Sequence, residues 1–360
     1  MSASRRARRR CPRGLLAACS LVLAFVFKGG AGAAAGDVAV DATLDRYARP
    51  QSWVRLPDGR RLNLLCEGTG TPSVILEAGA GGSTLDWRRV QSPLARTTRV
   101  CSYDRAGLGF SEPGPLPRSA EAVVADLESL LQAAAIGPPY VLVGHSLGSY
   151  FVRLYADRHL ADVAGLVLVD PSVEYQDERL AAVNPTLAAL LREDRANAEQ
   201  CLRLARRGQL RADLPVFRAC TYGYTREPGF SDTLFRVQID RRLSVPFREA
   251  LLSETGAMAT DSRVLAAERR SFGDRPLIVL TQSPETGQAY PGLTAAQVDA
   301  QNALWSRLHE ELAALSARGV HRVVEGAGHY IQKDRPDVVI DAIRRVIEDS
   351  RRAPRPAPDR

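Results

Sequence analysis

One short segment constrains the fold of this chain more than any other. Tyr140–Val143 is an apolar run, Gly144-His145-Ser146-Leu147-Gly148 follows it, and the amphipathic stretch Ser149–Asp157 comes next. This order predicts a buried strand, a sharp turn and a helix. The two glycines suit a turn at which strand and helix pass within contact distance. The serine would then sit in a strained conformation at the helix N-terminus, with its hydroxyl exposed.

The rest of the chain alternates short apolar runs with longer amphipathic stretches. Apolar runs of four or five residues are typical of strands buried on both faces of a parallel sheet. Helical periodicity is visible in Ser119–Ala134, and helix starts are indicated at Thr294 and Pro336. We therefore expect an α/β fold with a mostly parallel central sheet flanked by helices. The expected sheet strands are Val74–Glu77, Val100–Tyr103, Tyr140–Val143, Leu166–Asp170, Leu277–Leu280 and Val320–Val324, after a hairpin that turns at Pro57-Asp58-Gly59.

One interval breaks this alternation. Residues 172–272 are rich in Arg and Leu and show no clear strand, so we interpret them as a helical lid inserted into the fold. The core of the fold would then consist of residues 36–171 and 273–350. The tail, 351–360, holds three prolines and four arginines and is expected to be disordered.

The first 35 residues have the order of a secretory signal peptide. Met1–Arg13 is basic, Gly14–Phe27 is apolar, and Ala33-Ala34-Ala35 forms an A-x-A cleavage site before Gly36. The apolar run of 14 residues is shorter than the roughly 20 that a membrane helix needs. We expect a secreted, periplasmic or otherwise extracytoplasmic protein, with an uncleaved N-terminal membrane anchor as the alternative.

The net charge of +7 resides in this leader. It holds seven of the 48 basic residues and no acid, so the remaining chain has 41 basic and 41 acidic residues. A balanced body has no drive for counterion-release binding to a polyanion, and nucleic acid is not expected as a partner. The Gly-rich run at 78–82 lacks the G-x-x-x-x-G-K-[ST] pattern, and no cysteine pair has C-x-x-C spacing. We therefore expect no cofactor and no metal.

The serine of the sharp turn is a candidate nucleophile, and its hydroxyl needs a base. The chain has five histidines. His159 and His309 lie on expected helices among charged neighbours and are interpreted as solvated, while His321 opens the last strand at the wrong end of the sheet. His329 follows the C-terminal end of that strand, the edge where open α/β sheets bind ligands. We expect His329 to be the base, and His145 to point elsewhere.

Nucleophilic attack on a carbonyl also needs donors for the oxyanion. We expect the backbone N–H groups of Leu147, directly after Ser146, and of Ala80, in the loop after Val74–Glu77. Glycines around Ala80 allow the backbone to approach a substrate closely. The alternative interpretation of Ser146 is an incidental serine on a buried turn.

Taken in order, these motifs resemble the α/β-hydrolase fold superfamily over about residues 50–350, least so in the lid. The resemblance rests on Ala78-Gly79-Ala80-Gly81-Gly82, Tyr103-Asp104-Arg105-Ala106-Gly107-Leu108-Gly109-Phe110-Ser111, Gly144-His145-Ser146-Leu147-Gly148, Val169-Asp170-Pro171 and Gly326-Ala327-Gly328-His329. It implies the α/β-hydrolase fold and hydrolysis of an ester, amide, thioester or lactone. Superfamily members that act on epoxides or carbon–halogen bonds use an Asp nucleophile, and Ser146 argues against those reactions. Ala78-Gly79 departs from the common His-Gly, and Ser149 replaces a frequent small residue.

The resemblance places the acid of a catalytic triad after the sixth or the seventh strand, and a carboxylate stands at each place. Asp170 lies at the tip of Leu166–Asp170, and Glu285 lies in the loop after Leu277–Leu280. A short carboxylate mounted on the sheet holds an imidazole better than a longer one on a loop. We favour Asp170 and keep Glu285 as the alternative acid.

The resemblance implies a secreted serine hydrolase of the carboxylesterase or lipase type. Ser146 would attack the acyl carbon, His329 would take its proton, and water would release the acyl-enzyme. One alternative is an aminopeptidase like proline iminopeptidase, which needs acidic lid residues for the substrate amine; another is a hydrolase-like binding protein without turnover. The expected partner is a small-molecule ester or amide. The acidic lid residues on offer are Glu174, Asp177, Glu178, Glu193 and Asp194.

Four cysteines remain after the leader. The strand order of the superfamily makes the second and fourth strands neighbours, which implies a disulfide between Cys66 and Cys101. An exported compartment permits it, and two buried thiols are the alternative. Cys201 and Cys220 could form a second bridge within the lid.

Overall fold

The computed structural model of the chain describes residues 39–286 and 293–352. The predicted signal peptide, residues 1–35, lies outside the described residues, as does most of the predicted tail. The tail prediction was wrong at its start, because the last helix continues through Arg351 and Arg352. The strands are β1 (Ser52–Arg55), β2 (Arg61–Glu67), β3 (Ser73–Glu77), β4 (Val100–Tyr103), β5 (Tyr140–His145), β6 (Val163–Val169), β7 (Leu277–Gln282) and β8 (Gly319–Val324).

These strands form one sheet in the order β1-β2-β4-β3-β5-β6-β7-β8. β1 pairs with β2 and β2 with β4 in antiparallel register, and the remaining neighbours are parallel. The predicted α/β fold with a mostly parallel sheet is confirmed. The helices are α1 (Arg88–Leu94), α2 (Ala120–Ala133), α3 (Gly148–Arg158), α4 (Gln176–Ala181), α5 (Leu187–Arg206), α6 (Phe217–Cys220), α7 (Asp232–Leu243), α8 (Val245–Glu268), α9 (Ala295–Ala313), α10 (Ile331–Asp334) and α11 (Pro336–Arg352), with 3-10 turns η1 (Ala42–Ala48), η2 (Thr84–Trp87) and η3 (Leu160–Asp162).

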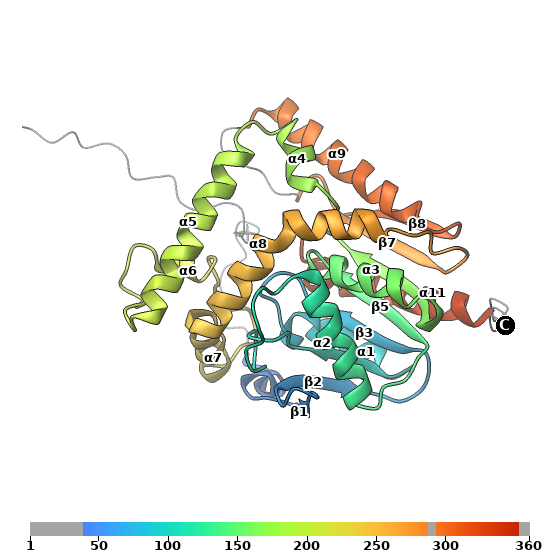
Figure 1. Cartoon of the computed structure of the whole chain (residues 1–360), viewed down its shortest axis with the longest axis horizontal. Helices are drawn as coiled ribbons and strands as arrows, with labels where there is room; N and C mark the ends of the chain where they lie inside the picture. Colours follow the sequence, from blue (N-terminus) through green and yellow to red (C-terminus); the bar gives the residue numbers. More distant parts are fainter. Residues whose placement is uncertain (1–38, 287–292, 353–360) are drawn as a thin grey trace, which may run out of the picture.

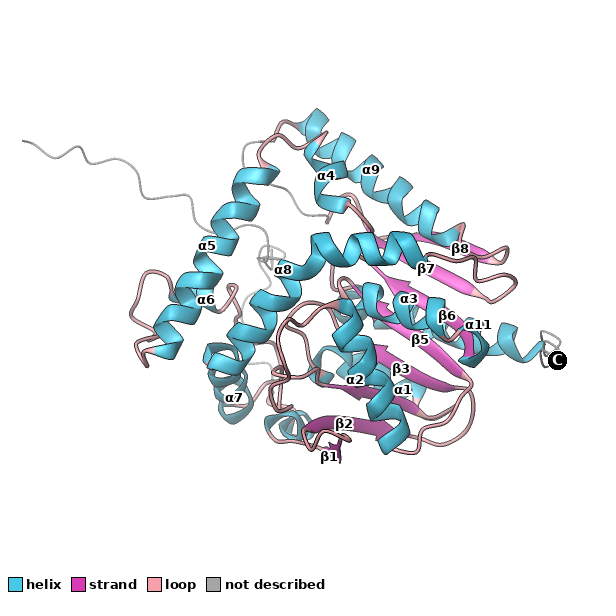
Figure 2. Ribbon diagram, in the orientation of Figure 1, coloured by secondary structure: helices cyan, strands magenta, loops and turns pink. Residues whose placement is uncertain are grey.

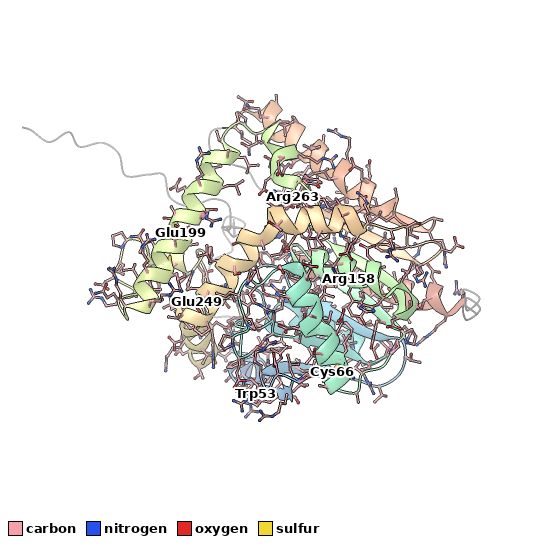
Figure 3. The ribbon with its side chains drawn as sticks, viewed as in Figure 1. Trp53, Cys66, Arg158, Glu199, Glu249 and Arg263 are labelled. Carbon is pink, nitrogen blue, oxygen red and sulfur yellow. A yellow bond between two sulfur atoms is a disulfide. The ribbon has the colours of Figure 1, made fainter. Side chains whose placement is uncertain are left out.

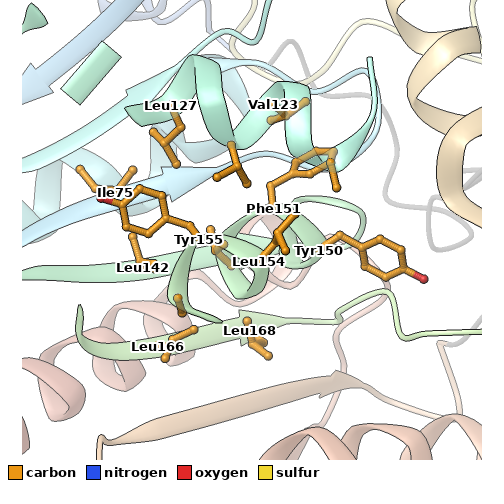
Figure 4. Packing of buried hydrophobic residues seen from close by; sticks show 14 of the residues in the cluster. Ile75, Val123, Leu127, Leu142, Tyr150, Phe151, Leu154, Tyr155, Leu166 and Leu168 are labelled. Carbon is orange, nitrogen blue, oxygen red and sulfur yellow. The ribbon is translucent and has the colours of Figure 1, made fainter. Parts of the chain in front are cut away.

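Helices cover both faces of the sheet, and alternate residues of each central strand serve the two faces (Figure 2). In β3, Ile75 packs in the cluster that contains residues of α2, α3 and α9, while Val74 and Leu76 pack with residues of α1 and α11. Figure 4 shows the first cluster, where Phe151 and Leu154 lie between α2 and the strands. Strands that are apolar on both sides therefore become the middle layer of three.

The predicted helix starts follow from capping. Thr294 accepts a hydrogen bond from the Gln297 amide and closes a capping box at α9. Ser119 caps α2 in the same way, through the Ala122 amide. Each side-chain oxygen satisfies an amide that the first helical turn leaves without an intrahelical partner. A third helix, α11, begins at Pro336.

Between β6 and β7, residues 172–272 contain the helices α4 to α8 and no strand. In Figure 1, α5 and α8 run beside each other above the C-terminal ends of the strands. Cys201 of α5 is bonded to Cys220 of α6. Cys66 and Cys101 face each other across β2 and β4 and form the other disulfide. Within the described ranges, no helix is long and apolar enough to cross a membrane.

Candidate active site

The turn between β5 and α3 holds Ser146 in a left-handed conformation, with φ +51°. A Cβ on Gly144 would stand 2.6 Å from a methyl group of Val152, and one on Gly148 would stand 2.6 Å from the carbonyl oxygen of Ala78. Both distances are far shorter than carbon atoms tolerate. Glycines are therefore required on either side of Ser146 for the helix to return so closely over the strand.

His329 and Asp170 meet at the same edge of the sheet. His329 lies in the loop after β8 and Asp170 directly after β6, and His329 Nδ1 lies 2.6 Å from Asp170 Oδ2. The other carboxylate oxygen accepts the amide of Gln282 at 3.0 Å and the indole N–H of Trp305 at 3.1 Å. Burial alone would raise the pKa of Asp170, but the hydrogen bond from His329 and nearby His309 hold it below its usual value.

The ionised carboxylate fixes the tautomer of His329. A carboxylate can only accept, so Nδ1 of the imidazole carries the proton and Nε2 is the proton-accepting nitrogen. Ser146, His329 and Asp170 all line one cavity of about 330 Å³. The arrangement can therefore take a proton from a serine hydroxyl and stabilise the resulting imidazolium.

The two candidate acids differ in their surroundings. Asp170 is fully buried and held by three hydrogen bonds to its carboxylate. Its backbone has φ +41°, and its amide donates to the carbonyl of Leu280. Glu285 is exposed. The structure brings Asp170, not Glu285, to His329.

The predicted oxyanion donors, Leu147 and Ala80, both line the cavity. Neither amide donates a hydrogen bond to a described residue. The carbonyls that precede Ala80 are held by Arg105, which donates to Ala78 at 2.6 Å and to Gly79 at 2.8 Å. Arg105 therefore occupies two carbonyl oxygens of this loop, which suits a loop that presents N–H groups to a substrate.

The sequence matches the alpha/beta hydrolase family over residues 74–342. The chain belongs to the alpha/beta hydrolase family. The uncharacterized protein YqjL of Bacillus subtilis is 36% identical over 107 residues, which make up 30% of this chain and 42% of that relative. The chain thus spans about two-fifths of the length of this relative, and a further relative is matched over 40% of its length.

Solved hydrolase structures share the fold. A thermophilic esterase from Thermogutta terrifontis superposes with a TM-score of 0.53 at 22% identity, covering 84% of this chain and 99% of that one. The epoxide hydrolase CorEH superposes with a TM-score of 0.56 at 18% identity, covering 82% and 98%. Both likenesses extend through most of this chain, and at these identities they establish its fold alone.

His145 supports the backbone of His329. Its Nε2 donates to the carbonyl oxygen of His329 at 3.0 Å, and its ring packs 4.7 Å from the imidazole of that residue. Burial and the neighbouring His329 lower the pKa of His145 to about 3, so it stays neutral. His145 does not line the cavity that contains Ser146, in agreement with the prediction that it points elsewhere. It contacts the loop that carries the candidate base.

The prediction that His309 is solvated was wrong. His309 is fully buried, donates from Nε2 to the carbonyl of Pro171 at 2.9 Å, and lies 2.6 Å from Thr281 Oγ1. Burial lowers its pKa to about 4. Its ring also packs 4.6 Å from Trp305. His309 thus holds the residue after Asp170, and Trp305 holds its carboxylate.

The other two histidines have simpler roles. His159, which was also predicted to be solvated, is half-exposed and lies 2.7 Å from Glu128. His321 contacts Thr281 Oγ1 through Nε2 at 2.8 Å, within β8 rather than at the cavity. Neither lines the cavity that contains Ser146.

Sequence reasoning missed Trp305 and the role of Arg105. Trp305 and His309 are four residues apart on α9, on the stripe that also buries Leu304, Leu308 and Leu312. That periodicity was the available signal, since neighbours at i, i+4 share a helix face. Arg105 is tied to Glu254 in the lid, 149 residues away, for which the sequence offers no signal.

The lid supplies most of the cavity wall. Two of the five acidic lid residues, Asp177 and Asp194, line the cavity, whereas Glu174 pairs with Arg153 at 3.0 Å. Among the described residues, no group of three or more His, Cys, Asp or Glu is placed to hold a metal ion. The aliphatic side chains of the wall are Ala80, Leu147, Leu180, Leu187, Leu191, Ala198, Leu252, Met258 and Ala259.

Proposed function

We propose that this chain is an exported serine hydrolase that cleaves carboxylic esters through an acyl-enzyme. One observation carries the proposal: His329 is bonded to the buried Asp170 carboxylate at 2.6 Å, and both share a cavity with Ser146. A serine on a strained turn, a histidine of fixed tautomer and a buried acid are the three parts that acyl transfer by serine needs.

The reaction follows from these positions. Ser146 Oγ attacks the acyl carbon as its proton passes to His329 Nε2, and the carbonyl oxygen becomes an oxyanion that accepts from the amides of Leu147 and Ala80. The intermediate collapses, the carbon–oxygen bond to the alcohol breaks, and the alcohol leaves with the proton from Nε2. Water then attacks the acyl-enzyme by the same sequence and releases the carboxylic acid and Ser146. Asp170 keeps its negative charge throughout and stabilises the imidazolium.

Ester hydrolysis is favoured over the other reactions of this fold. Epoxide opening, as the superfamily performs it, uses an Asp at the position of Ser146, so the fold shared with an epoxide hydrolase does not transfer that activity. The leucines of the wall, among them Leu180, Leu187 and Leu191, suit the apolar part of an uncharged ester.

Aminopeptidase activity is the second candidate, because Asp177 and Asp194 line the cavity and could bind an ammonium group. Burial, however, raises the pKa of Asp177, which weakens it as a partner for a cation. We therefore rank ester cleavage first. A binding protein without turnover would have no need for the bonded His329–Asp170 pair.

Export is part of the proposal. The leader of this chain has the order of a signal peptide, and two disulfides in one chain suit an oxidising compartment. Membrane attachment would follow if the N-terminal segment were retained.

A fluorophosphonate probe tests the proposal. It should label the folded protein but not Ser146→Ala, and a panel of p-nitrophenyl esters beside aminoacyl anilides should give turnover on the esters. Folded protein that takes no label would support a binding role, and turnover confined to the anilides would support the aminopeptidase.

A further inference from the structure

A second cavity, of about 520 Å³, lies beside the one that contains Ser146. It is bounded by α5, α8 and the segment before α2, and in Figure 1 the two helices run alongside each other at this place. Its apolar wall includes Leu116, Pro117 and Leu202. Leu116 is 56% exposed, so this outer cavity opens toward solvent.

The two cavities share three residues: Arg195 of α5, and Leu252 and Gly256 of α8. Leu252 and Gly256 are one helical turn apart and therefore lie on the same face of α8. This shared boundary separates the inner cavity, with Ser146, from the outer one. We call it the threshold.

Gly256 leaves the threshold unobstructed because it has no side chain. Its φ is not in the left-handed region, so its backbone does not require glycine. Glycine inside a helix costs about 1 kcal/mol relative to alanine, and Gly256 stands in the middle of α8. A Cβ built on it would meet a single atom within 4 Å, Arg195 Nη1 at 3.7 Å. The position is therefore open space that a larger side chain would fill.

Arg195 can move away from the threshold. Its side chain is 64% exposed, and its ion pair with Glu199 joins residues on one exposed helix face. Such surface pairs stabilise a conformation by less than about 1 kcal/mol. Farther out, Arg206 pairs with Glu249 at 2.6 Å and links α5 to α8 beside the outer cavity (Figure 3 labels Glu249 and Glu199). Charged side chains thus line part of the outer cavity.

We propose that a linear aliphatic chain of the substrate crosses this threshold, so that its reacting ester lies at Ser146 and its end lies in the outer cavity. The inference rests on the proposed function and narrows its substrate class to esters with a long alkyl chain, on the acyl or the alcohol side. The inner cavity has room for a short ester. The apolar residues of the outer cavity, which include Leu116, Pro117 and Leu202, give each added methylene a surface on which to pack, worth about 0.8 kcal/mol when fully buried.

Gly256→Leu is the test, because it fills the threshold without disturbing the helix. We expect the ratio of kcat/KM for p-nitrophenyl decanoate to that for p-nitrophenyl acetate to fall by about tenfold or more. Decyl acetate against ethyl acetate tests the alcohol side. Gly256→Ala, which adds one methyl group at ordinary contact distance, should have a smaller effect. A loss of long-chain preference in either series supports the proposal, and unchanged ratios in both overturn it.

Arg263→Leu is the matched control. Arg263 is exposed, lies two turns beyond Gly256 on the same face of α8, and lines neither cavity (Figure 3). Its substitution should leave both ratios unchanged.

Binding separates this inference from the proposed function. In a Ser146→Ala background, p-nitrophenyl decanoate should bind more tightly than the acetate, and the added Gly256→Leu should remove most of that difference. The measurement needs no turnover, so it decides the inference even if the chain hydrolyses none of the esters. Equal affinities for the two esters in the Ser146→Ala protein would overturn it.

Discussion

Trp305 donates its indole N–H to Asp170 Oδ1 at 3.1 Å, while His329 donates to Oδ2 of the same carboxylate at 2.6 Å. The two donors come from α9 and from the loop after β8, and they approach opposite oxygens. Trp305 also lines the cavity, so one side chain both contacts the substrate space and holds the candidate acid. Its N–H withdraws charge from the carboxylate and fixes its rotation toward His329.

Trp305→Phe should keep the packing and remove the donor. We expect a loss of about 10-fold in kcat on p-nitrophenyl esters, because a hydrogen bond to a charged group is worth about 1.5–3 kcal/mol. Steady-state kinetics on one p-nitrophenyl ester, with circular dichroism to verify folding, measures the effect. Asn302→Ala, on the same cavity wall, should not lower kcat in this way. An unchanged kcat in Trp305→Phe would contradict the assignment.

The choice between the two acids has a direct test. Asp170→Asn should lower kcat by about 10⁴-fold, since an amide imposes the wrong tautomer on His329. Glu285→Gln should leave kcat within about twofold, because Glu285 is exposed. Steady-state kinetics on one activated ester, with circular dichroism to verify folding, decides the matter. If Glu285→Gln abolished turnover and Asp170→Asn retained it, Glu285 would be the acid.

The sequence predicts the central strands, the sharp turn and the base because each depends on local pattern. Ser146 is flanked by glycines that the close approach of the helix to the strand requires. His329 follows a strand whose C-terminal end can be located from the sequence pattern. His309 shows where local pattern misleads. Its neighbours Glu310 and Glu311 are charged, yet the 3.6-residue period places it beside Leu308 and Leu312 on the buried stripe of α9.

The rest could not be predicted, because it depends on contacts between distant segments. Arg105 binds Glu77 in β3, Glu254 in the lid and two carbonyls of the loop after β3. Asp104, next to it, accepts the amides of Thr84 and Phe110 and so holds the turn after β4. Nothing in the spacing of residues 105 and 254 indicates that they meet.

Glu254→Gln should destabilise the protein strongly. Arg105 and Glu254 are 1% and 0% exposed and pair at 2.8 Å. Breaking a buried ion pair costs about 3–5 kcal/mol, and the remaining pair of Arg105 with Glu77 keeps the loss near the lower end of that range. Urea unfolding measures the difference. Glu268→Gln is the control, since its pair with Arg158 is solvent-exposed and should contribute below about 1 kcal/mol. Equal effects of the two substitutions would mean that the buried pair does not anchor the lid.

Asp261 should make the protein less stable as the pH rises. Burial raises its pKa to about 6, and the nearby Glu121 and Glu254 raise it further. The folded state therefore binds more protons than the unfolded state between about pH 4 and 6, so this group lowers the unfolding free energy as pH increases through that window. Asp261→Asn should reduce the slope, as measured by urea unfolding at several pH values. Asp299→Asn, at an exposed position, should not; an unaltered slope in Asp261→Asn would contradict the prediction.

The Cys201–Cys220 disulfide should stabilise the lid rather than the sheet. Both sulfurs are buried, and the bond joins α5 to α6 across a sequence separation of 19 residues. A loop of this size is worth about 3 kcal/mol in the entropic account. Cys201→Ala/Cys220→Ala should therefore be cleaved faster by a protease between residues 207 and 216, while cleavage within the sheet is unchanged.

Unreduced peptide mapping of the parent protein should recover the Cys66–Cys101 and Cys201–Cys220 linkages. Alkylated free thiols at all four positions would contradict both bonds, and equal protease sensitivity of the parent and the double variant would show that the second bond does not hold the lid.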